Sequence, residues 1–197
     1  MIQNALMSSR FRNVLDQIDR ANKEDPQRAA MATTSFPHEY VYSLCLTEWV
    51  LKLRPDASEA LRIAARGQHI RRWTIPRSTY DAGRTGYLKW RTDLKKFHAE
   101  TVGAIMTQEG YGIAETEHVK EIILKKNLKD SDTQTIEDAL CLVFLETQFQ
   151  ELKSKTPLEK MREIIRKTWA KMSPEGQAAA LSLPLSEEDR ILISSSI

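Results

Sequence analysis

The chain has 197 residues, of which 41% are hydrophobic, so it is long enough and apolar enough for one domain with a sizeable core. Its formal net charge of +2 excludes a general polyanion binder, and it contains no run of about 20 apolar residues of the kind that spans a membrane. Because the N-terminal stretch carries charges too early for a secretory signal, we expect a cytoplasmic protein without membrane contact.

The two cysteines, Cys45 and Cys141, each lie inside an apolar run. Such cysteines usually behave as small buried hydrophobic residues. We therefore predict no disulfide, and a reducing compartment fits this composition.

Helical periodicity covers most of the chain, while alternating strand patterns are scarce and there are only seven glycines. Ser35 and Pro37 are typical of a helix start, and Pro55 and Pro76 of helix ends. We expect about eight or nine helices and essentially no sheet. The predicted helices cover about 9–22, 37–53, 58–75, 84–108, 115–126, 133–151 and 158–171, with two more after Pro174 and near 187–192.

The segment over 139–145 is apolar on all sides, which is typical of a helix at the centre of a domain. Asp138 shares a helical face with Leu142 and Leu145, so its carboxylate points towards the core and needs a metal, an arginine or several donors. The fold class that we predict is an all-α, single-domain helical bundle over 1–197. Its buried central helix lies near 133–151, and 156–197 is a C-terminal helical extension packed on the bundle.

Basic residues are concentrated in one segment, where Arg62, Arg66, Arg71, Arg72, Arg77, Arg84, Lys89 and Arg91 stand against a single acid, Asp81. Arginine forms bidentate contacts with phosphate, so this segment favours an anionic, phosphate-bearing small molecule as partner. The alternative is a solvated face whose arginines pair with acids of other helices. The arginines that we assign to phosphate binding are Arg66, Arg71, Arg72, Arg77, Arg84 and Arg91.

Helical spacing predicts on which face of their helices His69 and His98 lie. His69 follows Arg62 and Arg66 at helical intervals, so we place it on the arginine face of the third helix. His98 lies on the apolar stripe of the next helix together with Leu94, so we place it inside the fold.

Five stretches carry a family resemblance: IDRANKEDP (18–26), AARGQHIRRWTIPR (64–77), GRTGYLKWRTDLKKFHAE (83–100), LKDSDTQTIEDALCLVFLE (128–146) and IIRKTWAKMSPEG (164–176). They closely resemble a family known as domain of unknown function 4202, over nearly the whole chain. The family name brings no activity with it.

A looser resemblance is to the HD-domain phosphohydrolases, which are all-helical metal enzymes. Their pattern has a histidine at the start of one helix, a His-Asp pair at the end of a later one, a further histidine in some members, and a distant aspartate on a central helix. In this chain the corresponding order is His38, Gln68-His69, His98 and Asp138. The doublet departs from the pattern, because Gln68-His69 lacks the aspartate that helps to hold the metal.

The second resemblance implies a metal-dependent phosphohydrolase that acts on a nucleotide or another phosphate compound. His38, His69, His98 and Asp138 would hold a divalent transition metal, and Glu137 or a metal-bound water would start the reaction. No organic cofactor is indicated. The departure at the doublet favours the alternative, a non-catalytic module that binds RNA or a phosphorylated ligand through the same arginines. The core-facing Asp138 and the inward His98 favour the phosphohydrolase. The sequence leaves this choice, and the oligomeric state, open.

Overall fold

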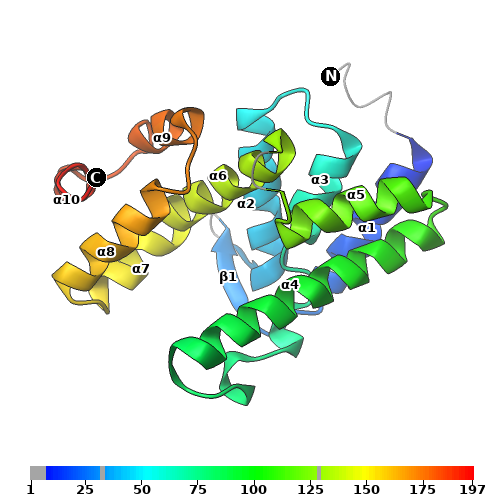
Figure 1. Ribbon diagram of the computed structural model, residues 1–197, viewed down its shortest axis with the longest axis horizontal. Helices are drawn as coiled ribbons and strands as arrows, with labels where there is room; N and C mark the ends of the chain where they lie inside the picture. The colour runs from blue at the N-terminus through cyan, green and yellow to red at the C-terminus, as the bar shows by residue number, and fades with distance from the viewer. Residues whose placement is uncertain (1–7, 32–33, 128–129) are drawn as a thin grey trace.

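The computed structural model describes residues 8–31, 34–127 and 130–197, and the all-α prediction is confirmed (Figure 1). Two 3-10 turns, Arg72–Thr74 and Arg77–Thr79, lie in the connection between the third and fourth α-helices, and a π-helical turn, Phe144–Gln148, separates the sixth from the seventh. The helices are α1 (Ser9–Lys23), α2 (His38–Leu53), α3 (Glu59–Gly67), α4 (Gly83–Gln108), α5 (Ile113–Leu124), α6 (Ser131–Val143), α7 (Phe149–Ser154), α8 (Leu158–Trp169), α9 (Pro174–Leu181) and α10 (Glu187–Ser194).

Short polar side chains set many of the helix starts. The N-cap side chains of Ser8, Ser58, Asp130, Ser173 and Ser186 each accept a hydrogen bond from the backbone N–H three residues further on. Each such cap satisfies one of the N–H groups that a helix leaves without an internal partner. These caps therefore anchor the ends of helices that are otherwise held by packing.

The start of α2 differs from the prediction. Ser35 does not cap it, because Ser35 lies in a short antiparallel hairpin formed by β1 (Arg28–Met31) and β2 (Thr34–Pro37). The backbone N–H of Glu39 instead donates to Asp25 Oδ2 at 2.9 Å. A side chain from the end of α1 thus caps α2 across the hairpin.

The third helix is shorter than predicted, because α3 ends at Gly67 and not near Pro76. A Cβ atom at Gly67 would lie 2.3 Å from Val102 Cγ2, so α3 and α4 cross at a contact that only glycine permits. The chain then turns, and Arg71 adopts the left-handed conformation with φ 51°. His69 therefore lies in this turn and not on a helical face that it shares with the arginines.

The helices share one hydrophobic cluster. Ile136, Leu142 and Val143 of α6 are fully buried, as expected for the central helix. In Figure 1, α2 and α6 lie between the sheaf of α1, α3, α4 and α5 on one side and α7–α10 on the other. Met161 of α8 and Ile193 of α10 belong to the same cluster as the core of the first helices. Side chains of the segment 156–197, which the sequence predicts to be an extension, therefore belong to the shared core.

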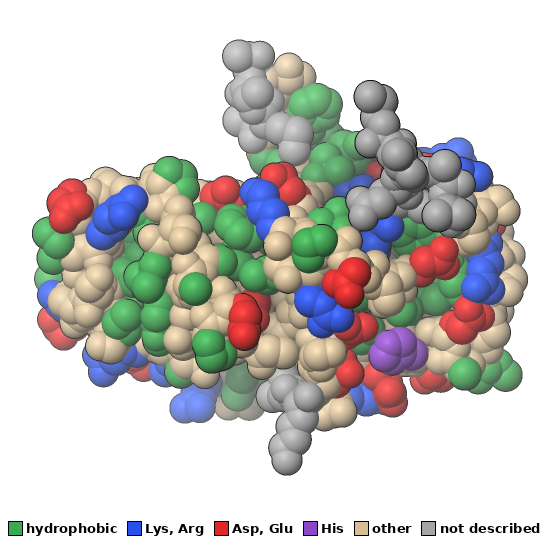
Figure 2. Space-filling model, turned by 90° about the horizontal axis from the view of Figure 1, so that it is seen from above, with side chains coloured by type: hydrophobic (Ala, Val, Ile, Leu, Met, Phe, Trp, Pro, Cys, Tyr) green, Lys and Arg blue, Asp and Glu red, His purple; other side chains and the backbone are tan. Residues whose placement is uncertain are grey.

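Figure 2 shows one face of the molecule, on which basic and acidic side chains are interspersed. Hydrophobic side chains gather on the side where α9 and α10 lie. This face carries no broad basic surface. None of the helices in the described ranges has the length and apolarity required to cross a membrane.

Candidate functional site

Segments from most of the fold surround a cavity of about 310 Å³. They are α2, the turn after α3, one face of α4, the end of α5, α6 with its π-helical turn, and the end of α8. Helical spacing explains the two longest walls, because their residues recur at intervals of three or four and so share one helical face. These residues are Tyr87, Trp90, Arg91, Leu94, Lys95 and His98 of α4, and Glu137, Leu140, Cys141 and Phe144 of α6.

The wall formed by α6 is distorted where it borders the cavity. Phe144 and Gln148, the first and last residues of the π-helical turn, both line the cavity. Trp49 Nε1 of α2 donates to Glu146 Oε2 of this turn at 2.6 Å, which ties it to the neighbouring helix. Single π-helical turns inside α-helices frequently lie at functional sites, so this irregularity supports a role for the cavity.

The cavity has a surplus of positive charge. Its only acidic lining residue among the described residues is Glu137, whereas five are basic: Arg72, Arg91, Lys95, Lys125 and Lys171. Lys125 Nζ lies 2.8 Å from Glu137 Oε1, so the one carboxylate is already paired. Within the ranges that the structure covers, no carboxylate lies within ion-pair distance of Arg91, Lys95 or Lys171.

The surplus charge shifts the pKa values of the lining groups. Burial lowers the pKa of Lys95, and the charges of Arg91 and Lys171 lower it further. Burial also lowers the pKa of Lys125, although Glu137 opposes this shift. Burial alone would raise the pKa of Glu137, but Lys125 and the other cations outweigh it and hold that pKa below its usual range. The cavity therefore favours an added negative charge.

The arginines of the cavity are held by aromatic rings. The Arg72 guanidinium lies 4.7 Å from the centre of the Trp90 ring, and Trp90 Nε1 donates to the carbonyl oxygen of Ile75 at 2.9 Å. Arg91 lies 5.7 Å from the centre of the Tyr87 ring. Such stacking fixes the plane of a guanidinium without neutralising its charge.

His98 is an inward residue, as predicted, and is only 2% exposed. Its Nδ1 lies 2.8 Å from the carbonyl oxygen of Ile70. A carbonyl oxygen can only accept, so Nδ1 carries the hydrogen and Nε2 is the bare nitrogen. Burial and the nearby His69 lower the pKa of His98 to about 3, which keeps the ring neutral.

Gln68 is the other deeply buried polar residue of the cavity, with 4% exposure. Its Nε2 donates to the carbonyl oxygen of Ile123 at 3.4 Å. Its Oε1 is buried and has no hydrogen-bond partner in the described part of the chain. The hydrogen bond to the α5 backbone therefore orients the amide so that Oε1 is the atom left without a partner.

Behind the cavity, Glu39 links two histidines. Its Oε1 lies 3.5 Å from His38 Nδ1, and its Oε2 lies 3.4 Å from His69 Nδ1. Burial would raise the pKa of Glu39, but the two histidines hold it at about 2, so the carboxylate is charged near neutral pH. Burial lowers the pKa of His69 against the pull of Glu39. The His69 ring, which lines the cavity, also stacks on Tyr42 with centroids 4.3 Å apart.

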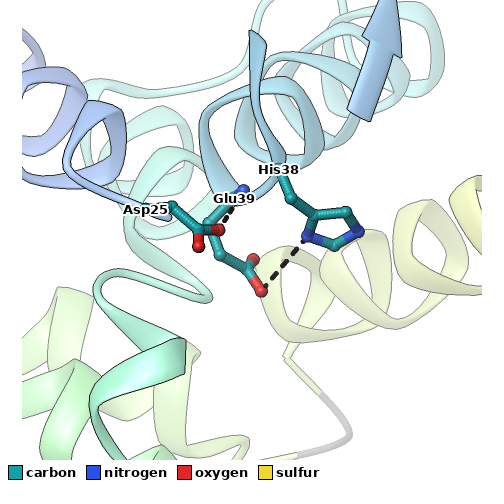
Figure 3. Close-up of side chains that lie close together, drawn as sticks. All are labelled: Asp25, His38 and Glu39. Atoms are coloured by element: carbon teal, nitrogen blue, oxygen red, sulfur yellow. Dashed lines mark hydrogen bonds and ion pairs between the residues drawn. The ribbon is translucent and has the colours of Figure 1, made fainter. Parts of the chain in front are cut away.

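Asp25, His38 and Glu39 form a group whose possible ligand atoms lie within 4.8 Å of one another (Figure 3). A metal ion is one use for such a group. Both oxygens of Asp25 already accept backbone N–H groups, those of Gln27 and Glu39, at 2.9 Å. The carboxylate of Asp25 thus has a structural task in joining α1 to α2.

Comparison of the sequence with known proteins assigns the chain to a family. The family model described as Domain of unknown function (DUF4202) matches residues 12–193. The chain belongs to this family. No curated protein and no solved structure matches it. The resemblance of this DUF4202 protein to HD-domain enzymes therefore stays a prediction. The cavity is the feature that bears on its function.

The structure only partly assembles the metal ligands predicted for the DUF4202 chain. The rings of His38, Tyr42, His69 and His98 follow one another at centroid distances of 6.5, 4.3 and 5.9 Å. Asp138 is not among the residues that line the cavity. Its Oδ1 accepts from Ser173 N at 2.8 Å and its Oδ2 from Ser173 Oγ at 2.6 Å, at the start of α9. The sequence predicts that this buried carboxylate needs a metal, an arginine or several donors. In the structure its partners are several hydrogen-bond donors.

Three of the six predicted phosphate-binding arginines have other partners. Arg66 Nε lies 3.2 Å from Asp19 Oδ1, and Arg71 Nη2 lies 2.9 Å from Glu24 Oε2. Arg77 donates to backbone carbonyl oxygens of the loop before α4. The structure thus gives Arg66 and Arg71 the paired role that was the alternative interpretation.

The remaining three arginines lie in different places. Arg72 and Arg91 line the cavity, although Arg72 Nε also lies 3.9 Å from Glu39 Oε1, and Arg84 is exposed in the first turn of α4. Sequence reasoning missed the lysines Lys95, Lys125 and Lys171, which come from three separate helices or their ends. Lys95 had a usable signal, because it follows Arg91 by one helical turn on the face of His98. The other two had none, since only the fold brings them to the cavity.

Proposed function

We propose that this DUF4202 protein binds a phosphorylated small molecule in the cavity. One observation carries the proposal: in the described lining, five cations stand against one carboxylate, Glu137, which Lys125 already pairs, and Arg72 alone has a further carboxylate behind the lining, Glu39 at 3.9 Å. Ammonium and guanidinium groups are strong donors to phosphate oxygens, and burial strengthens the attraction. A bound phosphate would also relieve the repulsion among the cations.

The size and walls of the cavity support a small ligand. Its volume of about 310 Å³ is at the lower end of the range for small-molecule sites, roughly 300–1,000 Å³. Tyr42, Trp90 and Phe144 add aromatic surface beside the cations. A mononucleotide or a sugar phosphate has the charge and the size that this combination suits. The cations lie in a concave site and not on a broad surface, which favours a small molecule over RNA.

Neighbouring residues provide a matched test of this proposal. Lys95 lines the cavity, whereas Lys96 is exposed outside it. Calorimetric titration with inorganic phosphate and with AMP should show binding to the wild type. Lys95→Ala should weaken it by about 10-fold or more, because a charge-assisted hydrogen bond contributes about 1.5–3 kcal/mol. Lys96→Ala should change it by less than about 2-fold. Equal losses in the two variants would contradict the proposal.

A single-stranded RNA oligomer distinguishes the other binding function. If the chain binds RNA through exposed arginines, Arg84→Ala should weaken RNA binding and Lys95→Ala should not. AMP would then fail to compete. This outcome would replace the small-molecule proposal with the RNA-binding one.

Hydrolysis of the bound phosphate is a second candidate function, and the contact between Glu39 and His69 favours it. Glu39 Oε2 lies 3.4 Å from His69 Nδ1, which is ion-pair distance without a formed hydrogen bond. A carboxylate at this position orients the neutral imidazole, whose Nε2 can then act as a general base. In this reaction water attacks phosphorus and gives its proton to His69 Nε2. The ester P–O bond breaks, and the leaving oxygen takes a proton from Lys95 or Lys125. Glu137 is a weaker base for this step, because its pKa is lowered.

Phosphate release from a panel of nucleoside monophosphates and sugar phosphates tests the second candidate. His69→Asn should abolish turnover while AMP binding persists, and His118→Asn, on the exposed surface of α5, should leave turnover unchanged. Elemental analysis tests the metal-dependent form of the reaction. That form requires a stoichiometric transition metal, and His38→Ala should remove it. Turnover by metal-free protein would contradict the metal-dependent form.

A further inference from the structure

Two side chains at the cavity present acceptor atoms without donors. Gln68 and His98 are 4% and 2% exposed, and both line the cavity. Gln68 Oε1 and His98 Nε2 are buried and have no hydrogen-bond partner within the described ranges. Buried polar atoms of native proteins are almost always paired, so a donor is expected at both positions.

The backbone fixes both atoms as acceptors. Ile123 O takes one of the two amide hydrogens of Gln68, and Ile70 O takes the Nδ1 hydrogen of His98. Exchanging the oxygen and nitrogen of the Gln68 amide, or moving the His98 hydrogen to Nε2, would break these bonds.

The cations of the lining have the opposite character, while hydroxyl and amide groups such as those of Tyr42, Thr168 and Gln148 can both donate and accept. Lysine and arginine side chains only donate, and Lys125 already occupies Glu137. A phosphate dianion only accepts, so it satisfies these cations but offers nothing to Gln68 Oε1 or His98 Nε2. A ligand that satisfies both parts must therefore carry donors in addition to its phosphate. A cationic amine is disfavoured among five cations, so the donor is a neutral group. The hydroxyl is the neutral donor that polyol and sugar phosphates carry.

We propose that the ligand is a phosphorylated polyol or sugar, and that Gln68 and His98 recognise its hydroxyl groups while the cations hold its phosphate. This inference rests on the proposed phosphate-binding function. It adds a substrate class, phosphate esters with free hydroxyls, and two specificity residues that contribute no charge.

A matched pair of ligands isolates the hydroxyls. Glycerol 3-phosphate and n-propyl phosphate share the phosphate and the three-carbon chain, and differ only in two hydroxyl groups. Calorimetric titration of the wild type should show roughly 10-fold or tighter binding of glycerol 3-phosphate. Gln68→Met, which keeps the length of the side chain but removes the amide, should reduce this preference several-fold. The affinity for n-propyl phosphate should stay within about 2-fold of the wild type.

A measurement on the wild type covers the case in which Gln68→Met does not fold. The ¹⁵N resonance of His98 Nε2 should move when glycerol 3-phosphate is added, because the bare nitrogen gains a hydrogen bond. It should not move with n-propyl phosphate at equal saturation.

The outcomes separate this inference from the proposed function. If neither ligand nor inorganic phosphate binds the wild type, the phosphate-binding function itself is wrong. If both esters bind with equal affinity, the cavity binds phosphate but does not recognise hydroxyls, and the inference is overturned. A preference that survives in Gln68→Met, with no movement of the His98 resonance, would overturn the assignment of these two residues.

Discussion

Asp138 is 4% exposed, and its two oxygens accept from Ser173 N, Ser173 Oγ and Gln134 Nε2. Removing it leaves the buried donors at the start of α9 without an acceptor. Asp138→Ala should therefore lower the free energy of unfolding by about 3 kcal/mol, and Asp138→Asn, which keeps one acceptor oxygen, by about 1 kcal/mol. Urea denaturation measures both. Wild-type stability in Asp138→Ala together with loss of a bound metal would support the predicted metal-binding role instead.

Individual side chains could be predicted from the sequence only where one helix decides their environment. The inward position of His98 follows from its place on the α4 stripe, and the buried carboxylate of Asp138 follows from its place on α6. The partners of Arg66 and Arg71 lie on α1 and at its end, and no spacing within α3 reveals them. A count of arginines therefore predicts a cationic region, but it gives no sign that Arg66 and Arg71 form ion pairs with Asp19 and Glu24.

At the scale of elements, the crossing of α3 and α4 depends on Gly67. A Cβ atom there would lie 2.3 Å from Val102 Cγ2, and this clash would push the helices apart. Gly67→Ala should lower the free energy of unfolding by about 1–3 kcal/mol, as overpacking does. Gly112→Ala is the control, because its Cβ atom would meet nothing closer than 3.4 Å. Thermal or urea denaturation compares them. The double variant Gly67→Ala/Val102→Ala should recover part of the lost free energy of unfolding. No recovery in the double variant would contradict the steric explanation.

The start of α2 should confer a pH dependence. The folded-state pKa of Glu39, about 2, lies below its ordinary value of 4.5. The charged carboxylate therefore stabilises the fold above pH 4.5, and this contribution is lost as the pH falls towards 2. Glu39→Gln should lower the free energy of unfolding by roughly 3 kcal/mol near neutral pH. The difference from the wild type should shrink as the pH falls. A difference that is constant between pH 6 and 3 would contradict this role.

Two features of the elements could not be predicted from periodicity. The helical pattern continues past Gly67, yet contact with α4 and the left-handed residue Arg71 end the helix there. The apolar segment over 139–145 predicts one long helix, but it gives no sign of the π-helical turn at Phe144–Gln148. Both features result from tertiary packing, and both border the cavity.

At the scale of the whole molecule, the cavity exists only because distant segments converge. Arg72, Lys95, Lys125 and Lys171 belong to parts of the chain that no local pattern connects. Their mutual repulsion disfavours the unliganded fold, since burial and neighbouring cations lower the pKa values of Lys95 and Lys125. An anion that binds only the folded chain should therefore stabilise it by linkage.

The melting temperature in the presence of AMP tests this account most directly. It is measured with millimolar AMP and with adenosine, at constant ionic strength, so that screening and general salt effects are equal. AMP should raise the melting temperature of the wild type and adenosine should not. Lys95→Ala should show a smaller rise, although without ligand it should be as stable as the wild type or more so. No rise with AMP, or an equal rise in Lys95→Ala, would contradict a phosphate-binding cavity.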